Sequence, residues 1–370
     1  MTIFISIPWF LPAYKAGGPI QSIVNLVNNF SENVAYYIFC GDTDLNNDPL
    51  QNITKGEWVQ YNNHTKIWYA QQENLSDTLA TQIECIKPDV LYIIGLFNWH
   101  FNIVPLLFCK ADKKILSVRG MLHPGALSQK QLKKRIFLAA LKIFGIAGKT
   151  IFHATDETEA AFIKKEFGTK ATIRVATNFA KTIIKKEPLK KTAGSLQMLT
   201  TALISPMKNH LQVLKALMFC NGNISYNIYG PIKDTAYWEL CTKQIEKLPQ
   251  NVSVKYHGEI LPTQVENILA QHHVFIMPSK SENFGHAIAE ALVAGKPVIT
   301  SNATPWNGLQ YHNAGINVEP TENAIADAIN FFTSLNNDEY KNDAEAASTY
   351  AESKLNLAEK INAYRNLFFN

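Results

Sequence analysis

Short apolar runs alternate with longer segments of helical periodicity along most of the chain. The apolar runs predict strands at 2–7, 34–39, 89–94, 114–118 and 150–153 in the first half, and at 197–203, 225–229, 252–256, 273–277 and 297–300 in the second. Strands that alternate with helices in this way form parallel sheets with helices on both faces. Residues 181–191 are rich in lysine and show little patterning, which predicts a linker. The pattern therefore indicates an α/β protein with two domains.

The length and composition of the chain agree with this interpretation and exclude some functions. At 370 residues the chain can form two domains of ordinary size, which we place at 1–182 and 183–353. A hydrophobic content of 46% and a charged content of 18% are typical of globular proteins. The formal net charge of +4 is too small to indicate nucleic acid as a partner. Five scattered cysteines without a CxxC pair favour neither a disulfide framework nor a zinc site.

Two glutamates flank the start of a predicted helix in the segment SENFGHAIAEALVAGKP at 281–297. Glu282 follows the strand at 273–277, and Glu290 lies inside the helix, which we expect to end at Gly295. Eight residues at ~1.5 Å each separate the two carboxylates by roughly 12 Å, about the span from the sugar to the ribose of a nucleotide-diphosphate sugar. Backbone N–H groups between them can bind the two phosphates. The alternative is a helix-capping acid and a solvated helix residue.

Two further segments favour an anionic ligand. Lys208, in SPMKNH at 205–210, follows a predicted strand and can supply a point charge to a phosphate. Gly17 and Gly18, in PAYKAGGPIQS at 12–22, follow the first strand and permit close approach of backbone amides to an anion. An ordinary first-turn lysine and an ordinary turn are the alternatives for these positions.

Taken together, these segments resemble the family-4 retaining glycosyltransferases of the bacterial surface-polysaccharide type. In that family a Glu-(seven residues)-Glu motif contacts the donor sugar and the ribose, and a glycine loop and a phosphate-binding lysine precede it. TPWNGL at 304–309 is similar to a stretch of many polysaccharide-assembly members. The resemblance implies the GT-B fold, in which two Rossmann-like domains with parallel sheets face each other across a cleft. It also implies that a last helix at 354–370 packs back on the first domain.

The resemblance implies a reaction and a set of site residues. It implies transfer of a sugar from a nucleotide-diphosphate donor, with a UDP-sugar favoured over a GDP-sugar, to a saccharide or lipid-linked acceptor in surface-polysaccharide synthesis. No cofactor and no metal are expected. The residues expected to act in catalysis are Glu282, Lys208, Arg119 and His123, and those expected to bind the donor are Gly17, Gly18, Lys208, Asn283, Phe284, Gly285 and Glu290.

The sequence departs from the family pattern at one position that bears on catalysis. Leu203 stands where the family usually has an arginine, five residues before the phosphate-binding lysine. Arg119, in an Arg-Gly-Met segment of the first domain, is the candidate for the missing cation. If no group replaces it, the chain is a catalytically weakened sugar-nucleotide-binding subunit. A sugar-nucleotide epimerase of the same fold is the other alternative, but it needs acid and base residues that the sequence does not identify.

Histidines and aspartates of the first domain suggest two further roles. His123 and His153 are candidates to face the acceptor, because a histidine can transfer a proton near neutral pH. Asp42-Thr43-Asp44 is a DxD triplet, which binds a divalent metal in another glycosyltransferase fold. Here it follows the strand at 34–39, away from the expected donor site, so we expect transfer without a metal.

The basic segment 130–142 has helical periodicity. Helices of this kind bind anionic head groups of membranes, and a solvated helix that packs its apolar side on the sheet is the alternative. Residues 90–109 are uncharged apart from a histidine, but their polar residues favour a buried strand, a loop and a helix over a membrane span. The N-terminus lacks the basic flank of a signal peptide. We therefore expect a cytoplasmic protein, with peripheral contact at the inner face of the plasma membrane as an open alternative.

Overall fold

The chain forms two compact units of nearly equal size. A computed structural model describes residues 1–127 and 131–370. The first unit contains Met1–Phe179 and Leu357–Asn370, and the second contains Ala180–Asn356. The sequence interpretation placed the first boundary after residue 182 and the return after residue 353, so the units divide three residues from each of these positions.

The first unit is built on an eight-stranded sheet with the strand order β3-β4-β2-β1-β5-β6-β7-β8. Its strands are β1 (Thr2–Ser6), β2 (Ala35–Gly41), β3 (Trp58–Asn62), β4 (Thr65–Ala70), β5 (Val90–Ile94), β6 (Lys113–Ser117), β7 (Ile151–Ala154) and β8 (Thr172–Val175). The pair β3 and β4 is antiparallel, and the other neighbouring strands are parallel. The central strands therefore need helical crossovers, as their apolar sequences predict.

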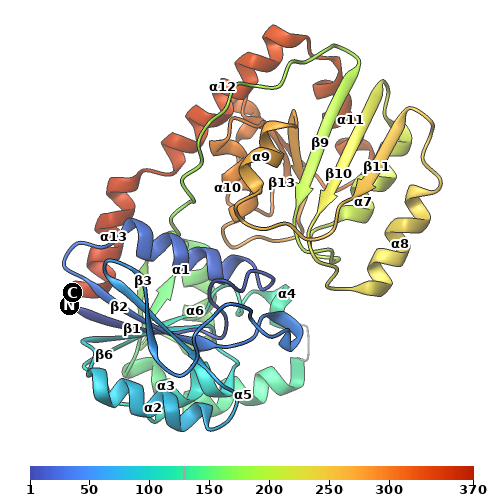
Figure 1. Ribbon diagram of the computed structural model, residues 1–370. Coiled ribbons are helices and arrows are strands. Elements are labelled where there is room, and N and C mark those ends of the chain that lie inside the picture. The colour runs from blue at the N-terminus through green and yellow to red at the C-terminus, as the bar shows by residue number, and fades with distance from the viewer. Residues whose placement is uncertain (128–130) are drawn as a thin grey trace. The chain divides into compact units, whose positions relative to one another are not determined.

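Helices cover both faces of this sheet. They are α1 (Gly18–Asn29), α2 (Leu75–Ile86), α3 (Val104–Leu107), α4 (Pro124–Leu127), α5 (Gln131–Ile143), α6 (Glu157–Phe167) and α13 (Leu357–Phe369). Helices α1 and α13 share one apolar core with the sheet, and α2, α3, α5 and α6 share the other. Figure 1 shows α1 and α5 on opposite sides of the first sheet. The last helix belongs to this unit because Tyr364, Leu367 and Phe368 are buried in the core that contains α1.

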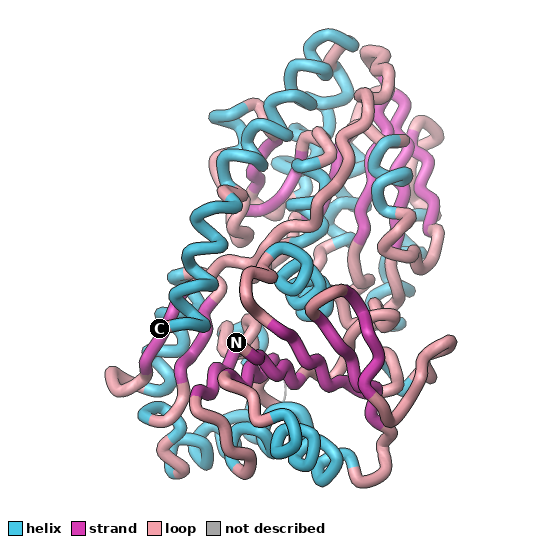
Figure 2. Tube along the Cα trace, turned by 60° about the vertical axis from the view of Figure 1, so that its left-hand side comes forward, coloured by secondary structure: helices cyan, strands magenta, loops and turns pink. Residues whose placement is uncertain are grey.

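The second unit is built on a six-stranded parallel sheet with the order β11-β10-β9-β12-β13-β14. Its strands are β9 (Ser195–Thr201), β10 (Asn223–Tyr229), β11 (Val252–Tyr256), β12 (Val274–Met277), β13 (Val298–Ser301) and β14 (Gly315–Val318). Its helices are α7 (His210–Ala216), α8 (Thr235–Ile245), α9 (Val265–Ala270), α10 (His286–Val293), α11 (Glu322–Ser334) and α12 (Asn337–Lys354). One core joins the sheet to α7, α8 and α11, and the other joins it to α9, α10 and α12. The strands of each unit lie between helices in Figure 2.

The sequence predicted the central strands of both sheets and missed strands near the edges. All ten predicted strands are present, with ends shifted by at most two residues. The missed strands are β3, β4, β8 and β14, of which β3, β8 and β14 form sheet edges. Edge strands are short and partly exposed, so their sequences lack the continuous apolar runs of buried strands. Residues 90–109 form β5, a helical turn at Trp99–Ile103 and α3, as expected. Within the described residues, no helix has the length and apolar character needed to cross a bilayer.

Candidate functional site

The loop between β12 and α10 carries the two-glutamate motif. Gly285 precedes the first residue of α10 with φ 73°, and a side chain there would press on Ile288 and Trp306. At the other end of α10, Gly295 donates to Leu292 O and Lys296 donates to Ala291 O, which is the Schellman pattern of a helix terminated by glycine. The predicted placement of the first glutamate in the loop and the second in the helix is therefore confirmed.

Hydrogen bonds connect three loops at the carboxyl ends of neighbouring strands. Lys280 N donates to Met207 O at 2.9 Å, which joins the loop after β12 to the loop after β9. Glu282 N donates to Ala303 O at 3.1 Å, which joins the same loop to the one after β13. Ligands of open parallel sheets bind at these strand ends. The loops that carry the lysine, the motif and the TPWNGL segment therefore form one structural group in the second unit.

Lys208 and Glu282 form an ion pair inside this group. The Lys208 Nζ donates to Glu282 Oε1 at 2.5 Å, and the two side chains are only 21% and 10% exposed. Seventy-four residues separate them along the chain. A partly buried pair of this kind is costly to break by removing one partner, because the other charge stays desolvated. The side chain expected to bind phosphate and the side chain expected to bind the sugar thus contact each other directly.

The side chain of Trp306 packs against the loop that carries the motif and donates a hydrogen bond to it. Trp306 is 3% exposed, and its Nε1 donates to Phe284 O at 2.6 Å. The Phe284 ring is itself buried and packs edge-on against the indole, with 5.8 Å between the ring centres. Phe284 was expected to bind the donor, and the structure places its side chain in the core of the second unit. Asn283 precedes it in the loop, next to the start of α10.

Glu290 is a partly buried carboxyl group on α10 whose charge is disfavoured. Burial raises the pKa of Glu290 to about 7, and the charge of Lys181 opposes that rise. Lys181 is held in place by a hydrogen bond from its Nζ to Pro262 O at 2.8 Å. An anionic group kept in such surroundings favours a ligand that donates hydrogen bonds to it.

Arg119 lies in a polar network of the first unit. Its guanidinium donates to Asn178 Oδ1 and, at 2.9 Å, to Tyr92 Oη, and Nε has no hydrogen-bond partner among the described residues. Burial opposes its charge, yet Tyr92 and Tyr364 raise the pKa of Arg119 above the ordinary value. Arg119 was expected to complete the cationic clamp, but its guanidinium is engaged with residues of its own unit. These contacts position Arg119 within the first unit, and its part in catalysis stays a prediction.

The two candidate histidines lie in different surroundings. His153 is fully buried, with Nδ1 bonded to Tyr92 Oη at 2.7 Å and Nε2 to Ala176 O at 2.8 Å, and burial lowers its pKa to about 3. The suggestion that His153 faces the acceptor is wrong, because the ring is enclosed in the core. His123 is only partly buried, in the turn between β6 and α4, and its Nδ1 accepts from Gly125 N.

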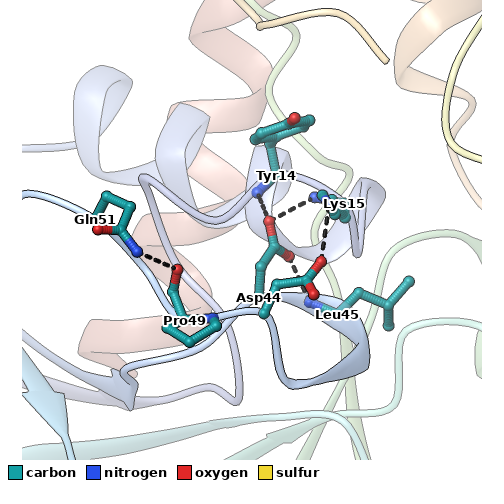
Figure 3. Close-up of polar contacts among 7 residues, drawn as sticks. Tyr14, Lys15, Asp44, Leu45, Pro49 and Gln51 are labelled. Carbon is teal, nitrogen blue, oxygen red and sulfur yellow. Dashed lines mark hydrogen bonds and ion pairs between the residues drawn. The ribbon is translucent and has the colours of Figure 1, made fainter. Parts of the chain in front are cut away.

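The glycine loop of the first unit is organised by Asp44. Gly17 has φ 72° and directly precedes α1, which begins at Gly18. The carboxylate of Asp44 accepts hydrogen bonds from the backbone N–H groups of Tyr14, at 2.9 Å, and Lys15, at 3.2 Å, as Figure 3 shows. Asp44 therefore fixes the segment just before the two glycines.

The other aspartate of the DxD triplet has a separate partner. Asp42 forms an ion pair with Lys55 Nζ at 2.7 Å, whereas Asp44 also accepts from Leu45 N. Across residues 1–127 and 131–370, no group of three or more histidine, cysteine, aspartate or glutamate side chains has the arrangement of a metal site. The triplet thus has a structural explanation that requires no ion.

Sequence reasoning missed the roles of three residues in these sites. Lys181 was assigned to a linker, and Asp44 was considered only as a metal ligand. Trp306 was noted only as part of a similar segment. A buried acid at Glu290 could have suggested a nearby cation, but no signal in the sequence identifies which lysine it is.

Comparisons with known proteins find a family model and solved structures that are similar to this chain. The family model described as "Glycosyl transferases group 1" matches residues 181–353, just under half of the chain. A search of curated protein sequences finds no match.

Solved structures with the same fold cover nearly the whole chain. Alr3699/HepE of Anabaena, solved with UDP and glucose, has a TM-score of 0.71 at 15% identity, over 99% of each chain. TarM of S. aureus, solved in a complex that includes UDP, has a TM-score of 0.73 at 11% identity, over 100% of each chain. WaaG, a glycosyltransferase involved in lipopolysaccharide biosynthesis, has a TM-score of 0.68 at 13% identity, over 97% of this chain and 98% of its own. These likenesses establish the GT-B fold.

Proposed function

We propose that the chain, whose residues 181–353 match the family model of the group 1 glycosyltransferases, transfers a sugar from a UDP-sugar to a saccharide or lipid-linked saccharide acceptor. We further propose that the anomeric configuration is retained and that the product belongs to a bacterial surface polysaccharide. The family resemblance of the motif segments supports retention, and the similarity of the TPWNGL segment to polysaccharide-assembly enzymes supports the pathway.

One observation carries this proposal: a lysine and the first motif glutamate meet beside the N-terminus of α10, and the second motif glutamate lies on the same helix. Sugar transfer needs stabilisation of the negative charge that develops on the leaving diphosphate. Lys208 supplies a cation for that charge, and the N–H groups at the start of α10 supply hydrogen bonds. Glu282 then binds the donor sugar, and Glu290 accepts hydrogen bonds from the ribose.

A panel of nucleotides and sugar nucleotides tests the donor assignment. Thermal shift is a suitable readout, since a ligand at ~100 times its dissociation constant stabilises the native state by about 2.7 kcal/mol. UDP and at least one UDP-sugar should raise Tm, whereas GDP should not. Stabilisation by GDP alone would overturn the choice of donor.

The leucine at position 203 favours the binding-subunit alternative, because half of the usual cationic pair is absent. Incubation of the protein with the donors that bind, followed by detection of free UDP, separates the two functions. Release of UDP, by transfer or by hydrolysis, supports the enzyme. Clear binding without turnover on any common donor supports the subunit.

Glu282→Gln should abolish transfer and leave UDP binding unchanged or tighter. The substitution removes the group assigned to the sugar, and it also removes a negative charge from beside Lys208, where the phosphates bind. Titration calorimetry with UDP and a transfer assay measure the two effects. A parallel loss of UDP affinity would contradict the assignment of Glu282 to the sugar.

Chelation of divalent metals should leave transfer unchanged. In this proposal Lys208 and the N-terminus of α10 meet the phosphate charge, while Asp42 and Asp44 are engaged with Lys55 and the 14–15 backbone. The initial rate is compared with and without EDTA. Loss of activity in EDTA that magnesium or manganese restores would support a metal site at the DxD triplet.

A further inference from the structure

Helix α5 presents apolar side chains to solvent. Of its residues Gln131–Ile143, only Leu138 and Leu141 are fully buried. Leu132, Ile136 and Ile143 are 74%, 62% and 85% exposed. At about 100° per residue these three side chains fall within roughly 40° of one another on the helix surface, on the side away from the two leucines. The alternative of a solvated helix that packs its apolar side on the sheet is therefore wrong for these three residues, which form an exposed apolar stripe.

The sequence around α5 is the most basic part of the chain. Residues 113–155 contain nine lysines and arginines and no aspartate or glutamate. The rest of the chain has 26 lysines and arginines against 31 acids, a net charge of −5. The net charge of +4 is the sum of +9 in this segment and −5 in the rest, so opposite charges are segregated along the chain. Such segregation indicates an anionic partner for this segment rather than for the whole surface.

Cations of α5 flank the apolar stripe on both sides. On the helix surface Lys133 lies to one side of the stripe, and Arg135 and Lys142 lie to the other. All three are exposed, and Lys142 forms an ion pair with Glu166 at 2.6 Å. Long basic side chains can keep their charges at the head groups while apolar neighbours enter the acyl boundary. Lys130 precedes this helix but lies outside the described residues.

Residues of α5 contact the body of the first unit. Lys134 Nζ donates to Ala126 O at 2.7 Å and lies 5.2 Å from the centre of the Phe97 ring. The Phe97 ring also packs against Phe137, with 5.3 Å between the ring centres. Figure 1 shows α5 on the face of the first sheet opposite α1. The stripe is therefore presented on a helix that packs against the first unit.

We propose that α5 docks the protein on an anionic lipid surface, with Leu132, Ile136 and Ile143 in the interface and Lys133 and Arg135 at the head groups. A helix of this length spans about 20 Å and lies in the interface plane, because it combines an apolar stripe with flanking cations and has no acid. A second copy of the chain is a poorer occupant, since it would bring the same cations together. The proposal concerns the first unit and does not depend on which donor is bound.

Flotation with lipid vesicles tests the proposal on the full chain. The protein should float with vesicles that contain phosphatidylglycerol, remain unbound with phosphatidylcholine alone, and dissociate as salt rises. Ile136→Ser with Ile143→Ser should weaken binding at least tenfold, and so should Lys133→Glu with Arg135→Glu. The UDP-dependent rise in Tm should persist in both variants, which verifies folding and separates this test from that of the donor site.

Matched substitutions in the second unit provide controls. Leu240→Ser removes a leucine that is 52% exposed on α8, and Lys243→Glu with Lys247→Glu reverses two exposed lysines. Both should bind vesicles as the parent does. Equal losses for the α5 and α8 variants, or no binding of the parent to anionic vesicles, would overturn the proposal. Self-association that disappears in the Ile136→Ser/Ile143→Ser variant, without vesicle binding, would assign the stripe to a second copy instead.

Discussion

Lys208→Ala is expected to lower the rate of sugar transfer by at least roughly a hundredfold while the protein stays folded. A charge-assisted contact to phosphate contributes ~1.5–3 kcal/mol, and about 1.4 kcal/mol corresponds to a tenfold change in rate. Leu203 stands at the position where the family usually has the second cation. The guanidinium of Arg119 is engaged with Asn178 and Tyr92. The substitution also leaves Glu282 without its partner at a site where its side chain is only 10% exposed. An unpaired carboxylate beside the phosphates repels them, which adds to the loss.

A double-mutant cycle separates the two contributions. Lys208→Ala should weaken UDP binding, and Glu282→Gln combined with it should restore part of that binding, because the repelling charge is gone. Transfer should remain absent in the double variant. Additive effects on UDP affinity would contradict the direct coupling of the pair.

Lys215→Ala is the matched control for this cycle. Lys215 lies on α7, in the same strand-to-helix segment, and forms a more exposed ion pair with Glu322 at 3.4 Å. Exposed pairs contribute about 0–1 kcal/mol, so this variant should keep its activity. Leu203→Arg tests the missing cation from the other direction and should raise the rate of Lys208→Ala. Transfer by Lys208→Ala within a few-fold of the parent would exclude Lys208 from phosphate binding.

Glu290→Gln is expected to stabilise the ligand-free protein at pH 8 and to weaken nucleotide binding. The pKa of Glu290 is raised from 4.5 to about 7, so the folded state binds more protons than the unfolded state between these values. The contribution of Glu290 to the free energy of unfolding therefore falls as the pH rises from about 4.5 to about 7. Above that range the charged carboxylate destabilises the folded state by the full amount. A shift of this size corresponds to at most about 3 kcal/mol, which glutamine would recover in part.

The same substitution removes the charged acceptor assigned to the ribose hydroxyls. UDP and uridine should each bind roughly tenfold more weakly, because hydrogen bonds to a charged acceptor contribute ~1.5–3 kcal/mol. The ratio of parent to variant affinity should shrink as the pH falls below about 7, since the parent carboxyl is then protonated. Thermal unfolding and calorimetry at several pH values measure both effects.

Two further variants make this result specific. Glu239→Gln removes an exposed glutamate from α8 and should change stability by no more than about 0.5 kcal/mol at any pH. Lys181→Met removes the cation that opposes the pKa rise, so the pH midpoint should move upward. A Glu290→Gln variant that binds UDP as tightly as the parent would contradict the assignment of Glu290 to the ribose, even if its Tm changes as expected.

The central strands and the motif helix could be predicted from local sequence. Strands such as 89–94 and 273–277 are continuous apolar runs, because both faces of a parallel sheet are covered. Gly285 and Gly295 bound α10 through left-handed backbone conformations that glycine adopts at low cost. The edge strands at 58–62 and 172–175 were not predicted from the sequence. An edge strand is partly exposed to solvent, so it does not need a continuous run of apolar residues.

The partners of the charged side chains could not be predicted in the same way. Lys208 meets Glu282 only because β9 and β12 are neighbours in the sheet, although 74 residues separate the two side chains in the chain. Arg119 is engaged with Asn178, and Asp44 with the 14–15 backbone, through contacts of 59 and about 30 residues in sequence separation. The sequence by itself determined which segments form strands and helices and which residue types stand at their ends. Only the tertiary structure decided which charges meet, because that depends on strand order and on the long-range packing that a local pattern does not encode.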